Sequence, residues 1–592
     1  MLRFGGLGWG LRHAPHIDER YFVENVGWML THRDLDHRFD EYPGLFFYAL
    51  TPVLAWFDPP RLGPDSYLAA RAMVAAFGVA SVGLVYVLGV RLGGFRTGLV
   101  AALLLAVSPV EVQTAHMVRP DIALECFVLA ALLAMTRVGM RSRDDLRAGA
   151  WMGAAAAIKF TGGLLVPSYL ARRLTTPGPR GRGVVLAGAA ALVAFALCSP
   201  HTILDLQGGV AGLATQVGYH YDVRPRGEQS FATMALTYGL VLVRALGAVA
   251  VALALIGVVL ARREWRQWLP LWLFPVTIVA VFSTAEVHHA RFVVPMLGVV
   301  ALCAGEAARR IGGRWAWVLA LVAAAGPLES SVDYVRGIHQ PSTRDLALDR
   351  IDATVPAGAT VVTTVTDLGL SRERYRVLPT VGLDEERARL LAEHADVVAA
   401  QPIADDALLR GLRTLEVIAP PNRHSGPPLA LATPIQRARY EAVDMRSVVV
   451  TASESADSVA ALVDGDPATW WSTAGPQGGN WIDLVLPRPV RIGRVELRVP
   501  GRGRLYGRNI HVLVQGPEGQ FRRVPVVSGL PPVDPGVRAG ARQLLIFAPV
   551  VASRVRLVQV AEAVRPWGVA ELRIDRRVDE AAVTEVITSS HP

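Results

Sequence analysis

The sequence predicts a polytopic α-helical membrane domain, followed by a small α/β unit and a C-terminal β-sandwich. Composition carries the membrane prediction, because 52% of the 592 residues are hydrophobic, only 19% are charged and the mean hydropathy is +0.34. The apolar surplus lies before about residue 330, and the remainder is rich in Arg, Asp, Glu, Pro and Gly. The predicted parts are a membrane domain at 1–330, an extracytoplasmic α/β domain at 331–440, a β-sandwich at 441–580 and a tail at 581–592.

Long apolar segments in the first part are the candidate membrane spans. A helix needs about 20 mostly apolar residues to cross the hydrocarbon core of a bilayer. A shorter run at 44–57 is expected to lie along the membrane interface. The candidate spans are 66–92, 97–113, 120–138, 148–171, 183–199, 231–261, 267–284, 290–308 and 313–328.

Arginine clusters in alternate loops predict the orientation of the spans. Cytoplasmic loops retain basic residues. The inside loops are therefore those at 91–96, 137–147, 172–182, 262–266 and 309–314. The acidic pair 18–19, the segment 119–121 and the loops 201–230 and 286–291 then face the opposite side.

The segment 148–171 breaks this alternation, because arginines flank both of its ends although its length allows about one crossing. A double glycine at 162–163 is a plausible break between two half-helices. We interpret the segment as a re-entrant pair with both ends inside, which places residue 330 outside. The alternative is a single crossing, which would place the cluster 172–182 outside.

Lys159 lies within this apolar segment and is the only lysine of the chain. A preference for arginine codons explains the rarity of lysine, and the net charge of +9 then says little about nucleic acid. An ammonium group at the centre of a membrane helix nevertheless costs roughly 2.5 to 3.5 kcal/mol. Lys159 is therefore expected to have an anionic partner or access to water.

The acidic pair Asp18 and Glu19 precedes the apolar segments, and none of those segments contains a comparable pair. A carboxylate on an outer loop can act as a general base toward a hydroxyl group. The alternative is that the pair caps a short interfacial helix beginning near Arg20. Residues 1–15 lack the apolar core of a secretory signal peptide.

Several short motifs, in order, resemble GT-C-fold glycosyltransferases, and most closely glycosyltransferase family 39 with its protein O-mannosyltransferases and lipid A aminoarabinose transferases. The resemblance covers about residues 12–330. The chain lacks the helix that precedes the acidic pair in the family, and it has Tyr42 where aminoarabinose transferases have a lysine before the proline. The motifs are His16-Ile-Asp-Glu19, Phe39-Asp-Glu-Tyr-Pro-Gly-Leu-Phe-Phe-Tyr48, Arg71, Val118-Arg-Pro-Asp121, Lys159-Phe-Thr-Gly162 and Ala290-Arg-Phe-Val-Val-Pro295.

The resemblance implies transfer of a sugar, with inversion, from a polyprenyl-phosphate carrier to an acceptor hydroxyl of a glycan, lipid or protein. It places the reaction at the extracytoplasmic face of a membrane, here expected to be a bacterial inner membrane. Asp18 and Glu19 are the expected catalytic pair, with Asp18 as base, and no cofactor is required. The expected phosphate-binding cations are Arg71, Arg119, Lys159 and Arg291. The expected sugar and acceptor pocket comprises His16, Glu41, Tyr42, Asp121, His288 and His289.

The α/β domain is predicted from helical runs at 342–354 and 384–394 and from β-branched or apolar runs at 359–365 and 396–400. It contains no phosphate-binding loop or nucleophile elbow, so its expected role is to cap the membrane domain. A linker is expected around 420–434. Cysteines occur only in apolar segments, which excludes disulfides and thiolate zinc sites from the soluble region.

Short strands after residue 441 predict the β-sandwich. The segments 461–471, 480–484, 554–557 and 569–572 resemble a discoidin, or F5/8 type C, domain, which implies glycan binding. The resemblance further implies a structural Ca²⁺, held by oxygen ligands; the alternative is a turn satisfied by its own backbone. The candidate calcium ligands are Asp464, Asp466, Thr469 and Glu571, and the candidate glycan-stacking residues are Trp470, Trp471 and Trp481, of which at least one is expected in the core.

Two further functions compete with the transferase. A decayed transferase scaffold would serve as a non-catalytic, membrane-anchored carbohydrate-binding protein. A transporter is the remaining class. The retained Asp18, Arg71 and Lys159 favour catalysis.

Overall fold

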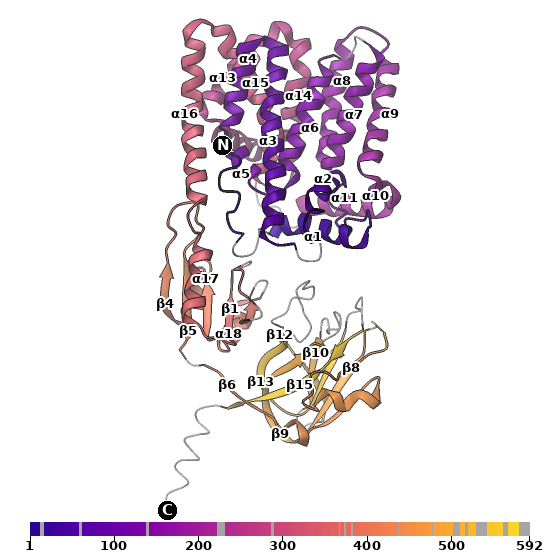
Figure 1. The fold of residues 1–592 in the computed structure, drawn as a ribbon, viewed down its shortest axis with the longest axis vertical. Coiled ribbons are helices and arrows are strands. Elements are labelled where there is room, and N and C mark those ends of the chain that lie inside the picture. The colour runs from indigo at the N-terminus through magenta and orange to yellow at the C-terminus, as the bar shows by residue number, and fades with distance from the viewer. Residues whose placement is uncertain are drawn as a thin grey trace, which may run out of the picture. The chain divides into compact units, whose positions relative to one another are not determined.

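A computed structural model gives the structure of the chain, and it divides into two compact units (Figure 1). Unit 1 comprises Met1–Pro341 with Asn422–Ser425, and unit 2 comprises Ser342–Pro421 with Gly426–Pro592. The boundary therefore falls at Pro341, 11 residues beyond the predicted end of the membrane domain at 330. The structure describes residues 1–11, 17–58, 62–137, 141–221, 231–285, 289–365, 368–371, 374–380, 383–435, 437–475, 478–500, 510–515, 519–528, 542–560 and 566–578.

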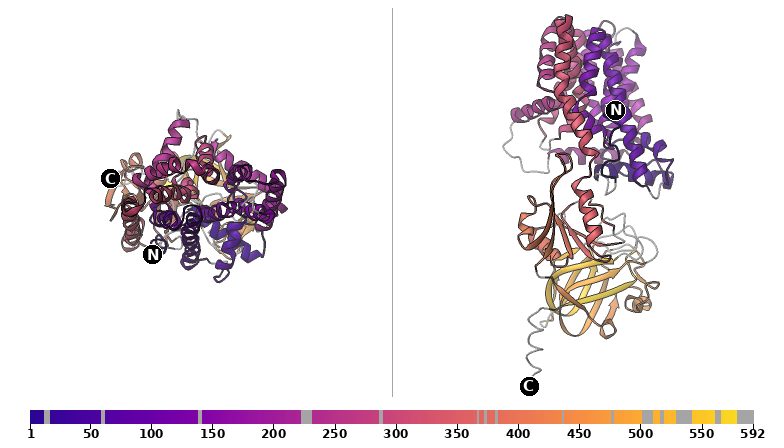
Figure 2. Two further views of the ribbon diagram at one scale, coloured as in Figure 1. Left: turned by 90° about the horizontal axis from the view of Figure 1, so that it is seen from above. Right: turned by 60° about the vertical axis from the view of Figure 1, so that its left-hand side comes forward.

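Unit 1 is helical, and its long helices stand side by side as a bundle, seen end-on in Figure 2. Apolar side chains from most of these helices form one buried cluster. The helices are α1 (Ile17–His32), α2 (Leu45–Leu54), α3 (Pro64–Gly93), α4 (Phe95–Ala106), α5 (Pro109–Ala115), α6 (Pro120–Met135), α7 (Ser142–Ile158), η2 (Phe160–Leu165), α8 (Val166–Thr175), α9 (Arg180–Cys198), α10 (Pro200–Leu204), α11 (Leu206–Tyr221), α12 (Phe231–Leu246), α13 (Ala248–Leu260), η3 (Ala261–Glu264), α14 (Trp265–Phe282), η4 (Ala290–Val293), α15 (Val294–Ile311) and α16 (Gly313–Ile338).

Some of these helices are long enough to span a membrane. Among the described residues, four helical segments are long and apolar enough to cross a membrane, or six spans if each of two bent helix pairs is counted as one. The predicted short run forms α2. The four segments are Pro64–Gly93, Arg180–Cys198, Ala290–Ile311 and Gly313–Thr354.

The predicted span 231–261 is not one continuous helix. Gly247 separates α12 from α13 with a φ of 85°, in the left-handed region that favours glycine. A Cβ atom there would lie 3.2 Å from the Cγ atom of Pro327 in α16. The prediction followed hydropathy alone, which does not register a helix break at a small apolar residue.

The segment 148–171 turns back on itself, as the arginines at both of its ends predicted. The break lies at Lys159, which has an extended backbone (φ −157°, ψ 134°) and ends α7, rather than at the double glycine. A 3₁₀ turn, η2, then leads into α8. The ends of the hairpin meet because Tyr169 of α8 donates a hydrogen bond of 2.7 Å to Asp145 in the first turn of α7.

Glycines in the hairpin allow its backbone to pack closely against neighbouring backbone. A Cβ atom on Gly162 would lie 2.4 Å from the backbone of Ala155, so the 3₁₀ turn can lie directly against α7. On another face of α7, Cβ atoms on Gly149 and Gly153 would each lie 2.1 Å from a backbone oxygen of α9. The spacing of four residues is the small-residue pattern that lets membrane helices approach closely.

The first part of unit 2 is an α/β domain with a five-stranded sheet in the order β2-β1-β3-β5-β4. β1 pairs in parallel with β2 and β3, whereas β5 runs antiparallel to β3 and β4. The predicted helix at 342–354 is confirmed, with Ser342 and Asp345 forming a capping box. The elements are α17 (Thr343–Thr354), β1 (Thr360–Thr363), β2 (Arg376–Pro379), α18 (Glu385–Ala392), β3 (Val397–Ala400), α19 (Asp406–Leu409), β4 (Leu412–Ile418) and β5 (Leu429–Pro434).

The predicted linker at 420–434 is wrong in its second half. Leu429–Pro434 forms β5, which is buried between β3 and β4. The flanking prolines indicated a linker, but the small apolar side chains between them fit a central strand. Asn422–Ser425 belongs to unit 1, where Arg423 donates a hydrogen bond of 2.8 Å to Asp333 of α16.

The second part of unit 2 is the predicted β-sandwich. Its eight-stranded sheet follows the order β11-β10-β13-β9-β15-β6, with β12 added to β13 and β7 added to β9, and β8 pairs separately with β14. Irregularities in the pairing of the two long strands bend the sheet around the core. The strands are β6 (Arg439–Ala442), β7 (Val449–Ala452), β8 (Trp471–Ser472), β9 (Trp481–Arg498), β10 (Ile510–Gln515), β11 (Phe521–Val524), β12 (Val526–Ser528), β13 (Arg542–Gln559), β14 (Gly568–Val569) and β15 (Glu571–Val578).

The two parts of unit 2 share a hydrophobic core. Val362 and Leu391 of the α/β domain belong to the same buried cluster as Val527, Leu544 and Ile546 of the sandwich. The sequence predicted two separate domains at this point. Continuous apolar packing across the junction explains why they form one compact unit.

Candidate active site

Charged side chains from four places in the sequence converge in unit 1. Asp18 lies in the first turn of α1, and Arg119 is the N-cap residue of α6. Lys159 ends α7, and Arg291 lies in η4 just before α15. Each side chain is therefore placed by a helix end, where the backbone changes direction and a long side chain can turn into a shared space.

Asp18 sits between two guanidinium groups. Its Oδ2 atom lies 2.7 Å from Nη2 of Arg119 and 3.6 Å from Nη1 of Arg291. The exposed fraction of the Asp18 side chain is 30%, against 12% for Arg119 and 23% for Arg291. The helix expected near Arg20 exists but begins at Ile17, so Asp18 lies within its first turn.

Lys159 has the anionic partner that its position required. Its Nζ atom donates a hydrogen bond of 2.9 Å to Oδ1 of Asp121 in the first turn of α6. The rings of Tyr42 and Phe292 each have their centroid 5.7 Å from Nζ, within the range of a cation–π contact. Because Asp121 follows Arg119 by two residues and Phe292 follows Arg291, the two ion pairs are neighbours.

Glu19 and Arg71 form a second ion pair, which is fully buried. Arg71 donates hydrogen bonds of 2.7 Å from Nε and from Nη2 to the two carboxylate oxygens of Glu19, and both side chains are 0% exposed. Nη1 donates to the backbone oxygens of Leu7 and Trp9. Four hydrogen bonds to protein groups therefore hold the Arg71 guanidinium, and the predicted roles of Arg71 in phosphate binding and of Glu19 in catalysis stay predictions.

The Glu19 pair ties the elements of the site together. Oε1 of Glu19 also accepts a hydrogen bond of 2.9 Å from the backbone N–H of Val118, the residue before Arg119. The pair thus links α1, α3 and the start of α6. The backbone partners of Arg71 were missed from the sequence, because nothing in residues 7–9 indicates which side chain they would meet.

The rest of the predicted pocket is placed only in part. Tyr42 and half-buried His289 lie near the Lys159 group, with the His289 ring edge-on to Phe292 at 5.3 Å. His16 and His288 lie outside the described residues. Glu41 lies in the loop before α2, where burial raises the pKa of its carboxyl and a hydrogen bond with Gln216 opposes the shift.

The described part of the chain contains no group of three or more His, Cys, Asp or Glu able to hold a metal ion. His116 is buried, with its ring nitrogens 2.7 Å from the backbone oxygens of Val112 and Gly5. His37, which sequence reasoning missed, is also buried and stacks on Phe47 at 4.4 Å. Burial lowers the pKa of His37 to about 4.

Three of the candidate calcium ligands in the sandwich form hydrogen bonds within their own turn, and the calcium site stays a prediction. Thr469 donates a hydrogen bond of 2.7 Å to Asp464, and this bond lowers the pKa of that carboxyl. Burial, with Asp464 nearby, raises the pKa of the Glu571 carboxyl, whose Oε1 atom is buried without a hydrogen-bond partner among the described residues. Asp466 accepts a hydrogen bond from the backbone N–H of Ala468, as in a turn satisfied by its own backbone.

The three candidate glycan-stacking tryptophans differ in how far they are buried. Trp471 is fully buried against Trp567, and its Nε1–H donates a hydrogen bond of 2.8 Å to the backbone oxygen of Glu454. It is therefore a core residue, not a stacking platform, because a buried ring cannot meet a glycan. Trp470 and Trp481 are half-buried, and the guanidinium of Arg556 lies 4.8 Å from the ring centroid of Trp481.

Residues 51–204 match the family described as dolichyl-phosphate-mannose-protein mannosyltransferase, which confirms the resemblance predicted from the motifs. None of the curated proteins matches the chain.

Several solved structures are similar to most of the chain or to about a quarter of it. ArnT from Cupriavidus metallidurans bound to undecaprenyl phosphate is 16% identical, and the alignment covers 73% of this chain and 96% of that chain with a TM-score of 0.46. A family 32 CBM from C. perfringens NanJ in complex with galactose is 14% identical over 23% of this chain and 100% of that chain, with a TM-score of 0.20. An F5/8 type C domain from Bacteroides fragilis is 24% identical over 23% of this chain and 97% of that chain, with a TM-score of 0.20.

Proposed function

We propose that the protein is a membrane glycosyltransferase that moves a sugar from a polyprenyl-phosphate donor to an acceptor hydroxyl, with inversion and with Asp18 as general base. One observation carries the proposal: a partly exposed carboxylate, Asp18, lies 2.7 Å from Arg119 and 3.6 Å from Arg291. A base and cations for a leaving phosphate are therefore side by side. The family match over residues 51–204 supports this class of reaction.

The reaction needs one proton transfer and one displacement. The acceptor hydroxyl gives its proton to the Asp18 carboxylate while its oxygen forms a bond to the anomeric carbon. The bond from that carbon to the phosphate oxygen breaks, and the electron pair leaves with the polyprenyl phosphate. A single displacement of this kind inverts the anomeric centre. Asp121, the other carboxylate nearby, is bound to Lys159 and only 4% exposed, which favours Asp18 as the base.

The cations near Asp18 would bind the leaving phosphate. Charge-assisted hydrogen bonds to phosphate oxygens stabilise the negative charge as it develops. Arg291 and Arg119 are partly exposed, and Lys159 lies beside them with 13% of its side chain exposed. Arg71 is not part of this set, because Glu19 and two backbone oxygens already occupy its guanidinium.

The acceptor side is assigned to the extracytoplasmic face, with the sandwich as an acceptor-binding module. Arginines cluster at the helix ends opposite Asp18, and this clustering favours a cytoplasmic position for those ends. A module with an oxygen-rich turn and half-buried Trp470 and Trp481 fits glycan binding, with Asp464 and Glu571 as ligands of a structural Ca²⁺.

A donor panel tests the proposal directly. Membranes containing the full chain are incubated with polyprenyl-phosphate sugars labelled in the sugar, and labelled product and released polyprenyl phosphate are measured together. We expect one donor to be consumed, and Asp18→Asn to lower the rate by about 10² or more, the usual contribution of a general base. Asp65→Asn, an exposed acidic residue in the first turn of α3, is the matched control and should keep wild-type activity.

Two outcomes separate the parts of the proposal. Transfer by the Asp18→Asn variant at the wild-type rate would contradict its role as base while leaving the transferase standing. If no donor is consumed although the protein binds glycans, the non-catalytic alternative is correct. Lys159→Met should raise the donor KM, and Lys159→Met combined with Asp121→Asn should not restore it, because the phosphate still lacks its cation.

A further inference from the structure

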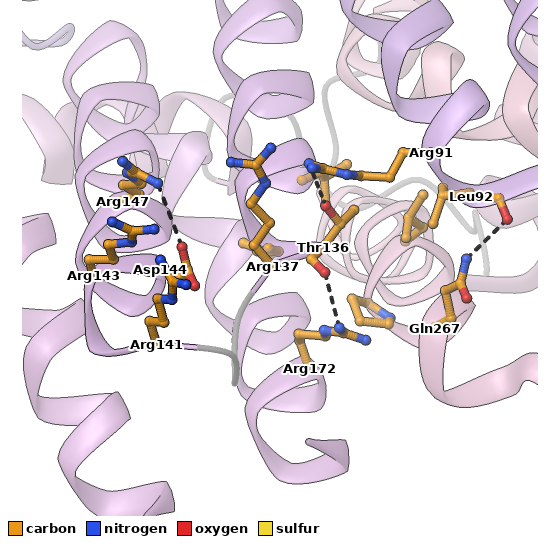
Figure 3. Close-up of a pocket in the computed structure, with 14 residues that line it drawn as sticks. Arg91, Leu92, Thr136, Arg137, Arg141, Arg143, Asp144, Arg147, Arg172 and Gln267 are labelled. Carbon is orange, nitrogen blue, oxygen red and sulfur yellow. Dashed lines mark hydrogen bonds and ion pairs between the residues drawn. The ribbon is translucent and has the colours of Figure 1, made fainter. Parts of the chain in front are cut away.

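A cavity of about 560 Å³ opens between helix ends of unit 1 on the side away from Asp18. The ends of α3, α6 and α8 and the first turns of α7 and α14 surround it (Figure 3). The candidate active site and the cavity lie at opposite ends of α6. Arg119 of the site precedes the first residue of the helix, and Met135, which lines the cavity, is its last residue. Its 16 residues span about 24 Å at 1.5 Å per residue. The cavity is therefore distinct from the candidate active site.

The lining of the cavity is strongly cationic. Among the described residues, six arginines and a single carboxylate, Asp144, line it. Arg147 and Asp144 form an ion pair across a long distance of 3.6 Å, and the Arg147 side chain is 55% exposed. The lining thus carries a net charge of +5. Its arginines are Arg91, Arg137, Arg141, Arg143, Arg147 and Arg172.

The helix ends use only part of this donor capacity. Arg91 donates to Oγ1 of Thr136 at 3.1 Å, and Arg172 donates to the backbone oxygen of the same residue at 3.1 Å. Figure 3 shows both guanidinium groups approaching Thr136, with Arg137 beside them. A guanidinium has five N–H donors, so one bond each leaves most of them for a ligand. Nε of Arg172 is buried without a partner among the described residues.

Apolar side chains form the other part of the lining. Met135 and Leu132 of α6, Leu92 of α3, and Pro270 and Leu271 of α14 lie beside the arginines. A free phosphate ion would gain nothing from these contacts. An amphiphile with an anionic head and an acyl chain would match both parts, and basic pockets between membrane helices bind anionic lipid headgroups in this way.

We propose that this arginine cavity binds the phosphate group of an anionic phospholipid, with the acyl chains against the Leu132 and Leu271 side. The guanidinium groups supply charge-assisted hydrogen bonds to the phosphate oxygens. The position of the cavity at the arginine-rich ends of the helices places the lipid in the leaflet opposite the candidate active site. The ligand is thus a bound structural or regulatory lipid and not the sugar donor at Asp18.

Lipid binding by matched variants tests the site. The full chain is placed in phosphatidylcholine nanodiscs, and binding of added cardiolipin or phosphatidylglycerol is measured by native mass spectrometry. Arg137→Gln, Arg141→Gln and Arg143→Gln are combined in one variant, and each is also measured alone. These arginines are exposed, so their replacement spares the buried core. We expect affinity of the triple variant to fall roughly hundredfold, because each arginine near an anionic headgroup contributes about fivefold.

The control removes the same charge from the same end of the bundle. Arg262→Gln, Arg263→Gln and Arg266→Gln change exposed residues of η3 and α14 that do not line the cavity. We expect this control to keep wild-type lipid affinity. Equal loss in both triple variants would overturn the proposal in favour of non-specific attraction. Displacement of the bound lipid by inorganic phosphate alone would overturn the lipid assignment and leave a free-phosphate site.

Discussion

Neighbouring carboxylates in this protein have opposite environments. Asp18 is 30% exposed between two arginines, whereas Glu19 is completely buried by Arg71. The sequence predicted that the pair lies at the reaction site, but it gave both residues a catalytic role. Helical geometry decides the difference, because consecutive side chains point about 100° apart and only one can face the shared space.

Glu19→Gln should therefore destabilise the protein rather than abolish chemistry selectively. Removing one partner leaves the Arg71 charge buried and unpaired, which costs about 3 to 5 kcal/mol. We expect a lower unfolding temperature in detergent, and partial recovery when Arg71→Met is added, since both charges are then gone. Asp18→Asn should unfold like the wild type. A Glu19→Gln variant with wild-type stability and no transfer would instead assign Glu19 to catalysis.

Buried His394 in the α/β domain predicts a dependence of stability on pH. Burial lowers its pKa from 6.5 to about 4, so the folded protein keeps the ring neutral while the unfolded chain protonates near pH 6.5. Stability is full above pH 6.5 and falls as the pH drops toward 4. The loss is at most about 3 kcal/mol.

Chemical denaturation of the full chain, followed by fluorescence of the buried tryptophans of unit 2, measures this effect. His394→Phe keeps a ring stacked on Tyr440, where the His394 centroid lies 4.9 Å away. Its stability should change less between pH 6.5 and pH 4 than that of the wild type. The same slope in both proteins would show that other groups cause the acid sensitivity.

At the level of elements, long apolar windows were predictable and their breaks were not. Hydropathy located α3, α9, α15 and α16, because their length in apolar residues is itself the signal. It missed the break at Gly247, and the double glycine at 162–163 misplaced the turn of the α7–α8 hairpin, which lies at Lys159. Both breaks depend on how the backbone packs against neighbouring elements. The strand β5 was missed for a similar reason: its burial comes from its neighbours in the sheet.

The contact between α7 and α9 offers an element-scale test. Gly149→Ala and Gly153→Ala would each place a methyl group 2.1 Å from a backbone oxygen, at Ala187 and Ala191 respectively, so the helices must separate. We expect a fall in stability of about 1 to 3 kcal/mol for each change. Gly188→Ala on α9 is the control, because nothing lies within 4 Å of its added Cβ. Thermal unfolding in one detergent compares the three variants.

On the scale of the whole molecule, the order of the parts was predicted and their junction was not. The shared cluster of Val362, Leu391, Leu544 and Ile546 means that removing 441–592 would expose the core of the α/β domain. Sequence patterns mark periodicity within a segment, but they do not tell which buried surfaces of two segments will meet. Substitution, not deletion, is therefore the sound way to test the sandwich.

Trp470→Ala with Trp481→Ala should weaken binding to a polysaccharide acceptor, because stacking surface is lost without disturbing buried Trp471. Tethering raises the local concentration of acceptor toward the millimolar range. Transfer to a long polymer should therefore fall, while transfer to a short soluble acceptor stays the same. Equal loss on both acceptors would indicate a structural role for these tryptophans.

The single lysine gives the molecule an unusual chemical handle. Lys159 carries the only side-chain amine, and it lies at the turn of the hairpin beside Asp121. An amine-directed acylating reagent can therefore modify only this side chain and the N-terminal amine. Occupancy of the site becomes readable as protection from acylation, in intact membranes and before any acceptor is identified. A protease specific for lysine would likewise have one cleavage point in the whole chain, directly at the candidate active site.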